Sequence, residues 1–151
     1  MAEIGFYHCT RQPAVGVAVR LADKAFGTGR RMLIVAEPPL LDALDERLWT
    51  DLPETFLAHG RQGGPDAALQ PILLAAPEGL AQAPENGATF LMLVSVPLPE
   101  RIAGFERLFL LFEEGSRAHE AARDSWRRLS GHAGLTRSYW QQKGQRWERA
   151  G

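Results

Sequence analysis

The segment that decides the fold is residues 4–36, "IGFYHCTRQPAVGVAVRLADKAFGTGRRMLIVA". It opens with a short apolar and aromatic run over 4–9, which is typical of a strand. From Pro13 to Phe26 apolar residues recur at helical spacing, and the glycines that follow are expected to end this helix. Residues 32–36 are apolar without interruption, as in a strand covered on both faces. The segment therefore predicts a strand, helix and strand in a βαβ unit.

The same alternation continues along the chain. A second helical pattern begins at Pro38 and ends near Trp49, and a third begins near Ser116. Further strands are expected within residues 55–60, 71–76, 88–96 and 108–112. Strands that alternate with helices favour an α/β fold, with an open, mostly parallel sheet flanked by helices. The Gly-, Pro- and Ala-rich stretches 60–69 and 77–87 are expected to be surface loops, so that residues 1–151 form a single domain.

Composition narrows the classes of function. The 151 residues are 45% hydrophobic and carry a net charge of −1, which gives no global nucleic-acid signature. Cys9 is the only cysteine, so an intramolecular disulfide and a cysteine-rich metal site are excluded. We expect a cytoplasmic protein without a membrane span, because no segment reaches the ~20 apolar residues that a span requires.

Catalytic motifs are not recognisable. The first βα turn, residues 8–16 "HCTRQPAVG", matches neither glycine-rich phosphate-binding pattern. His8 and Cys9 are adjacent on a strand, so their side chains are expected to point to opposite faces. No His or Cys lies at metal-ligand spacing from His59 or His132 in the sequence. We therefore expect no cofactor, no metal and no enzymatic activity from this chain, on a sheet that resembles a Rossmann fold without its nucleotide-binding loop.

The last third of the chain is basic and aromatic, unlike the nearly neutral whole. Its basic residues from 116 onward are Arg117, Arg123, Arg127, Arg128, Arg137, Lys143, Arg146 and Arg149, and its aromatic residues are Trp126, Tyr139, Trp140 and Trp147. On a helical wheel for residues 117–130, Ala118, Ala122, Ser125 and Leu129 form a core stripe, and His119, Arg123, Trp126, Arg127 and Ser130 form a second stripe beside it.

Three interpretations of the second stripe remain open. An Arg beside a half-exposed ring binds a carboxylate while the ring packs against an apolar side chain, which suits an acidic peptide with an apolar end. The stripe is also compatible with a solvated helix face. Arg with aromatic residues is, in addition, how proteins bind single-stranded nucleic acid. A small nucleotide-using enzyme is a further, weaker hypothesis.

Five segments carry a family resemblance: "IGFYHC", "RRMLIVAE", "LDERLWTDLPETFLAHG", "FERLFLLFE" and "AARDSWRRLSGHAGLTRSYWQQKGQRWE". In order, spacing and overall length they resemble the chi subunit of bacterial DNA polymerase III. The resemblance implies a non-catalytic accessory subunit of the clamp-loader assembly, with an α/β fold and no nucleotide site. It also implies binding to the C-terminal tail of single-stranded DNA-binding protein, an acidic peptide that ends in an apolar residue and a free carboxylate.

The resemblance assigns two surfaces. The tail-binding helix falls on Arg123, Trp126 and Arg127, with Arg128 and His119 as neighbours, and Arg123 is the first choice for the carboxylate. The second surface falls on Trp49, Phe56 and Phe112, which would dock the psi subunit, a lineage-specific substitute or a helicase-like protein. DNA contact would then be mainly indirect.

The sequence departs from the family pattern at three places. Trp126 stands where a Tyr is usual in the best-known members. The loop over 61–69 is rich in Gly and Ala, and residues 138–151 are longer and more basic than some chi tails.

Overall fold

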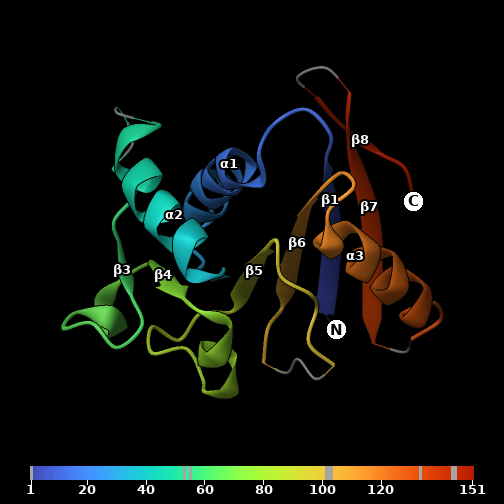
Figure 1. Cartoon of the computed structure of the whole chain (residues 1–151). Helices are drawn as coiled ribbons and strands as arrows, with labels where there is room; N and C mark the ends of the chain where they lie inside the picture. The colour runs from blue at the N-terminus through green and yellow to red at the C-terminus, as the bar shows by residue number, and fades with distance from the viewer. Residues whose placement is uncertain (1, 53, 55, 101–103, 133, 144–145) are drawn as a thin grey trace.

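A computed structural model describes residues 2–52, 54, 56–100, 104–132, 134–143 and 146–151 (Figure 1). In chain order its elements are β1 (Ala2–Cys9), α1 (Ala14–Phe26), β2 (Met32–Val35), α2 (Pro38–Thr50), β3 (His59–Arg61), η1 (Ala67–Leu69), β4 (Ile72–Ala75), η2 (Pro77–Ala81), β5 (Phe90–Val94), β6 (Arg107–Glu113), α3 (Arg117–Arg128), β7 (Leu135–Lys143) and β8 (Arg146–Arg149). None of the described helices is long and apolar enough to cross a membrane.

The strands form one eight-stranded sheet in the order β3-β4-β2-β5-β6-β1-β7-β8. Neighbouring strands are parallel throughout, except that β8 runs antiparallel to β7. The mostly parallel α/β class predicted from the sequence is confirmed. The two strands of the N-terminal βαβ unit are not neighbours, however, because β5 and β6 lie between β2 and β1.

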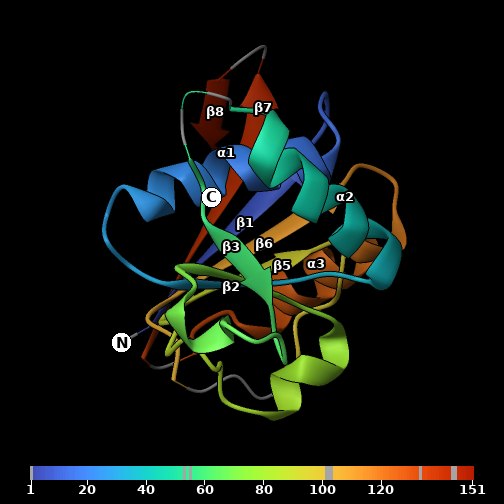
Figure 2. The ribbon, with the colours of Figure 1, turned by 90° about the vertical axis from the view of Figure 1, so that its left-hand side faces the viewer.

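Side chains alternate between two apolar layers, one on each face of the sheet. Helices α1 and α2 pack on the first face, over residues such as Ile34, Met92 and Leu111. Helix α3 packs on the other face, over Phe6, Leu110 and Phe112. Figures 1 and 2 show α2 near the β3 edge and α3 in front of β1 and β7. The two helices that carry the predicted sites therefore lie on opposite faces and toward opposite ends of the sheet.

Two features differ from the predicted elements. The strand expected over 55–60 is shorter and later, since β3 covers only His59–Arg61; Thr55 lies outside the described residues. Strands β7 and β8 were not predicted at all. Residues 135–143 combine polar and aromatic residues without an apolar run, and they form a strand because they pair with β1 on one side and with β8 on the other.

Candidate functional site

A pocket of about 300 Å³ lies beside α3, next to β7. Its walls come from three parts of the chain and are formed by Arg123, Trp126, Arg127, Tyr139, Ala150 and Gly151. Tyr139 belongs to β7, and its backbone N–H and C=O pair with Gly151 and Ala150. The three residues first assigned to the tail-binding helix thus line one pocket, together with residues 139, 150 and 151, which the sequence analysis did not assign.

The Trp126 ring is held in place by aromatic neighbours and by a cation. It meets the buried Phe6 ring edge-on at 5.1 Å between centroids and the Tyr139 ring at 5.5 Å. The Arg137 guanidinium lies 3.8 Å from the ring centroid and also donates to the Trp126 carbonyl. Cation–π contact of this kind stabilises by roughly 0.5–1 kcal/mol at exposed sites. The ring is half-buried, so one part of it anchors α3 while the rest faces the pocket.

The two pocket arginines differ in whether their guanidinium groups are paired with a carboxylate. Arg127 pairs with Asp124 at 2.7 Å, and both side chains are exposed. Arg123 is exposed, and no carboxylate within the described part of the chain pairs with it. Its five N–H donors are therefore available to an incoming carboxylate beside the Trp126 ring.

Two other residues assigned to this surface lie elsewhere. His119 is buried rather than surface-exposed: it packs on Phe112 with ring centroids 5.4 Å apart, and its Nδ1 accepts a hydrogen bond from the Gly115 amide. Burial lowers the pKa of His119, and the charge of Arg123 lowers it further. Arg128 is exposed but does not line the pocket; it points back toward Ser125. Neither belongs to the pocket surface.

The second predicted surface is an exposed aromatic cluster at the end of α2. Phe56 is 74% exposed and Trp49 is 46% exposed, and their ring centroids are 5.2 Å apart. Trp49 also packs on the buried ring of His59 at 4.2 Å. Large exposed apolar side chains that lie together are typical of an interaction site.

Polar contacts hold the His59 ring, on which Trp49 packs, in place. His59 hydrogen bonds through Nδ1 to the Leu57 carbonyl at 2.8 Å and through Nε2 to the Asp45 carboxylate at 2.7 Å. Arg61 in turn contacts Asp45 at 3.3 Å and Asp42 at 2.8 Å. The segment "LDERLWTDLPETFLAHG" (residues 44–60) thereby brings Asp45, Trp49 and His59 together, with Trp49 packed on His59.

Phe112 does not belong to the aromatic cluster, and its assignment to the second surface was wrong. Its exposed fraction is 0%, and its ring packs against those of both His8 and His119, under α3. A strand residue in the middle of a covered face cannot present its ring to a partner. The second surface therefore consists of Trp49 and Phe56.

The turn where a Rossmann fold would hold phosphate is filled by the chain's own side chains. The amides of Thr10, Arg11 and Gln12 all point to the Gln142 Oε1, at 3.0, 3.0 and 3.3 Å. The Ala14 amide, at the start of α1, donates to a Glu113 carboxylate oxygen at 2.8 Å. Because these donors already have acceptors, they do not form an open phosphate cradle.

A scan against protein-family models matched residues 1–136 to the family described as DNA polymerase III chi subunit, HolC. The chain belongs to this family. Family membership makes it an accessory subunit that associates with the DNA polymerase III holoenzyme. No curated protein sequence matched the chain.

The family match ends within β7, before several residues that shape the pocket of this chi-family chain. Tyr139, Ala150 and Gly151 all lie beyond residue 136. The sequence pattern that could have revealed Tyr139 is the alternation of side chains along β7. Arg137 and Tyr139 face α3. Ser138 and Trp140 face the other layer, where the Trp140 indole donates to the Ser138 hydroxyl. The high content of Arg and Gln in this segment obscured that alternation.

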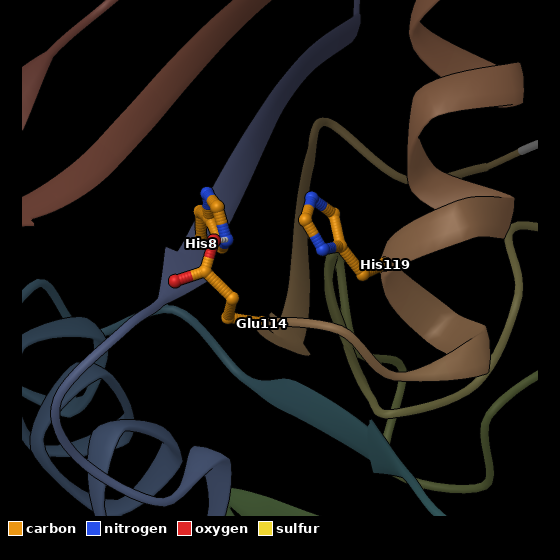
Figure 3. Close-up of side chains that lie close together, drawn as sticks. All are labelled: His8, Glu114 and His119. Carbon is orange, nitrogen blue, oxygen red and sulfur yellow. Dashed lines mark ion pairs between the residues drawn. The ribbon is translucent and has the colours of Figure 1, made fainter.

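The chi-family chain also brings three metal-ligating side chains together beneath α3. His8 on β1, Glu114 after β6 and His119 on α3 each place one ligand atom within 4.8 Å of the others (Figure 3). Burial lowers the pKa of His8, as does the neighbouring His119, while Glu114 opposes the shift. The sequence patterns predict no metal site, and they do not pair His8 with His119, which lies far away along the chain.

Proposed function

We propose that this accessory subunit ties DNA polymerase III to single-stranded DNA-binding protein by holding the acidic C-terminal tail of that protein in the pocket beside α3. The observation that carries the proposal is Arg123, an exposed guanidinium without a carboxylate partner among the described residues, next to the half-buried Trp126 ring. The guanidinium takes the terminal carboxylate of the tail. The Trp126 and Tyr139 rings take its apolar last side chain.

The aromatic cluster of Trp49 and Phe56 serves a different partner in this proposal. It docks the psi subunit or a lineage-specific substitute, such as a helicase-like protein, on the face opposite the tail pocket. Two observations support this proposal: Phe56 is exposed, and Trp49 packs on the buried ring of His59. One subunit can then hold both partners together, in the cytoplasm, with DNA contacted mainly through the bound protein.

Direct binding of single-stranded DNA is the second candidate function, and the placement of the rings argues against it. Stacking platforms need successive rings along one charged track. Here Trp126 and Tyr139 lie on the α3 face, whereas Trp140 and Trp147 pack around Tyr7 on the opposite face. Arg123→Ala would have a salt-dependent effect on oligonucleotide affinity if DNA were the ligand.

Calorimetry with a synthetic tail peptide tests the tail site. Arg123→Ala should weaken binding at least tenfold, because a paired Arg at such a contact commonly contributes about 2 kcal/mol or more. Arg128→Ala is the matched control: it removes the same charge from the same helix but outside the pocket, and should change affinity less than threefold.

Amidation of the peptide's C-terminus provides the complementary test, because it removes the anion and keeps the side chains. The amidated peptide should bind wild type as weakly as the free acid binds Arg123→Ala. Equal affinity of wild type for both peptides, or equal losses in Arg123→Ala and Arg128→Ala, would contradict the proposed site.

A further inference from the structure

The cluster of His8, Glu114 and His119 contains a buried nitrogen that makes no hydrogen bond within the described residues. His8 Nε2 is enclosed, and no hydrogen-bond partner for it occurs in the described part of the chain. The His8 side chain is only 5% exposed. Leaving a buried polar atom without a hydrogen bond destabilises the folded state. The nitrogen is therefore available to bind a ligand.

The other groups around this nitrogen have the chemistry of metal ligands. Glu114 Oε1 lies 3.5 Å from His8 Nε2, and the rings of His8 and His119 are 4.3 Å apart. Figure 3 shows the three side chains turned toward one another across the space between β1 and α3. Two ligand atoms on one tetrahedral zinc ion are roughly 3.3–3.5 Å apart, given bond lengths of ~2.0–2.1 Å. The first pair already has this separation.

The surroundings of the cluster orient its rings. The Tyr139 hydroxyl lies 3.2 Å from His8 Nδ1, so that Nδ1–H can donate to it and leave the Nε2 lone pair free. His119 Nδ1 accepts the Gly115 amide at 3.0 Å, so the metal-free ring carries its proton on Nε2. A metal must displace that proton or that hydrogen bond. Gly115 is exposed, and its amide can bond to water instead.

We propose that His8, His119 and Glu114 form a binding site for a divalent transition-metal ion of the zinc class. Imidazole and carboxylate ligands suit such ions, and two His with one Glu leave a fourth position for water. Glu114 is 61% exposed, so this position opens to solvent. The positive charge of Arg123 lies near the cluster and disfavours a bound cation. The negative charges of Glu114 and Glu120 act in the opposite direction. The bound ion links β1 to α3.

Zinc chloride titrated against a competing chelator dye, with the full chain, tests the site. Wild type should bind one zinc ion at micromolar or tighter concentration and gain melting temperature, because the ion binds only the folded chain. Glu114→Gln should lose at least tenfold in affinity, and His8→Leu should lose detectable binding. Glu78→Gln, an exposed acid outside the cluster, should bind as wild type does. Magnesium should not bind, since it avoids nitrogen ligands.

Glu114→Gln decides the outcome even if His8→Leu fails to fold, because Glu114 is at the surface. Zinc should also shift the ring-nitrogen NMR signals of His8 and His119. Absence of binding to wild type, equal affinity in Glu114→Gln, or shifts confined to other histidines would overturn the proposal. Peptide is absent from all of these measurements, so they stand apart from the proposed function.

Discussion

Arg123 and Arg128 carry the same charge on the same helix, yet the fold gives them different surroundings. Arg123 faces the pocket with Trp126, whereas Arg128 turns toward Ser125. A helical wheel predicts the Arg123 and Trp126 stripe correctly. It places His119 on the same stripe, but the buried positions of α3 are His119, Ala122 and Ser125. The wheel gives the spacing of residues but not the rotation of the helix over the sheet, which here brings His119 onto the rings of His8 and Phe112.

Cys9 should be inert in the folded protein. Burial raises the pKa of its thiol to about 12, and the Glu113 carboxylate acts in the same direction. The reactive thiolate is thus nearly absent at pH 8. A thiol-reactive dye should label the native chain much more slowly than the chain in urea. Equal labelling rates in the two states would show that the thiol is accessible.

The same pKa shift predicts how stability changes with pH. An unfolded thiol ionises near pH ~8.5, whereas the folded one does not until much higher pH. Because the folded state binds the proton more tightly, the free energy of unfolding should fall as pH rises from about 8.5 to 10. Cys9→Ala should make that fall shallower in urea titrations at several pH values. Identical slopes in both proteins would contradict the shift.

At the scale of elements, the apolar strands and the three helices are predictable, and the C-terminal hairpin is not. Strands β2, β4 and β5 are apolar because both of their faces are covered. Strand β7 is mostly half-buried and carries polar residues, so it lacks the continuous apolar run by which a fully covered strand is recognised in a sequence. The same holds for the pocket: its α3 residues can be predicted from the sequence, whereas Tyr139 can be assigned to it only once the pairing of β7 with β1 is known.

Gln142 joins two elements that are far apart in sequence, the β1–α1 turn and β7. Its Oε1 accepts from three consecutive amides. Gln142→Ala should lower the free energy of unfolding by about 1 kcal/mol, since water replaces part of these exposed bonds. Gln141→Ala is the neighbouring control and should cost less. Urea denaturation of both variants checks this, and equal losses would mean that the turn does not depend on Gln142.

The whole molecule places its two proposed binding surfaces on opposite faces of one sheet. Helix α2, whose sequence includes Trp49, lies near the β3 edge, and α3, whose sequence includes Trp126, lies over β1 and β7 (Figures 1 and 2). Trp49 of the first surface packs on His59, and Trp126 of the second packs on Phe6. Because the two surfaces share no residue, a change at one should leave binding at the other intact.

Phe56→Ala should separate the second surface from folding. The ring is 74% exposed, so its removal should change the free energy of unfolding by no more than about 0.5 kcal/mol. In pull-downs from the source organism, this variant should lose the second partner and retain single-stranded DNA-binding protein, and Arg123→Ala should do the reverse. Leu69→Ala, an equally exposed apolar residue, should retain both. Loss of both partners from either variant would mean that one surface serves both.

The four tryptophans offer the most direct test of the central claim, because Trp49 and Trp126 report on the two surfaces and Trp140 and Trp147 on the face opposite Trp126. Their indole N–H signals can be followed by NMR while the tail peptide of single-stranded DNA-binding protein is added. The account predicts a saturable shift of the Trp126 signal, with the Trp49 signal unchanged. A shift centred on Trp49, or no shift at Trp126, would contradict it.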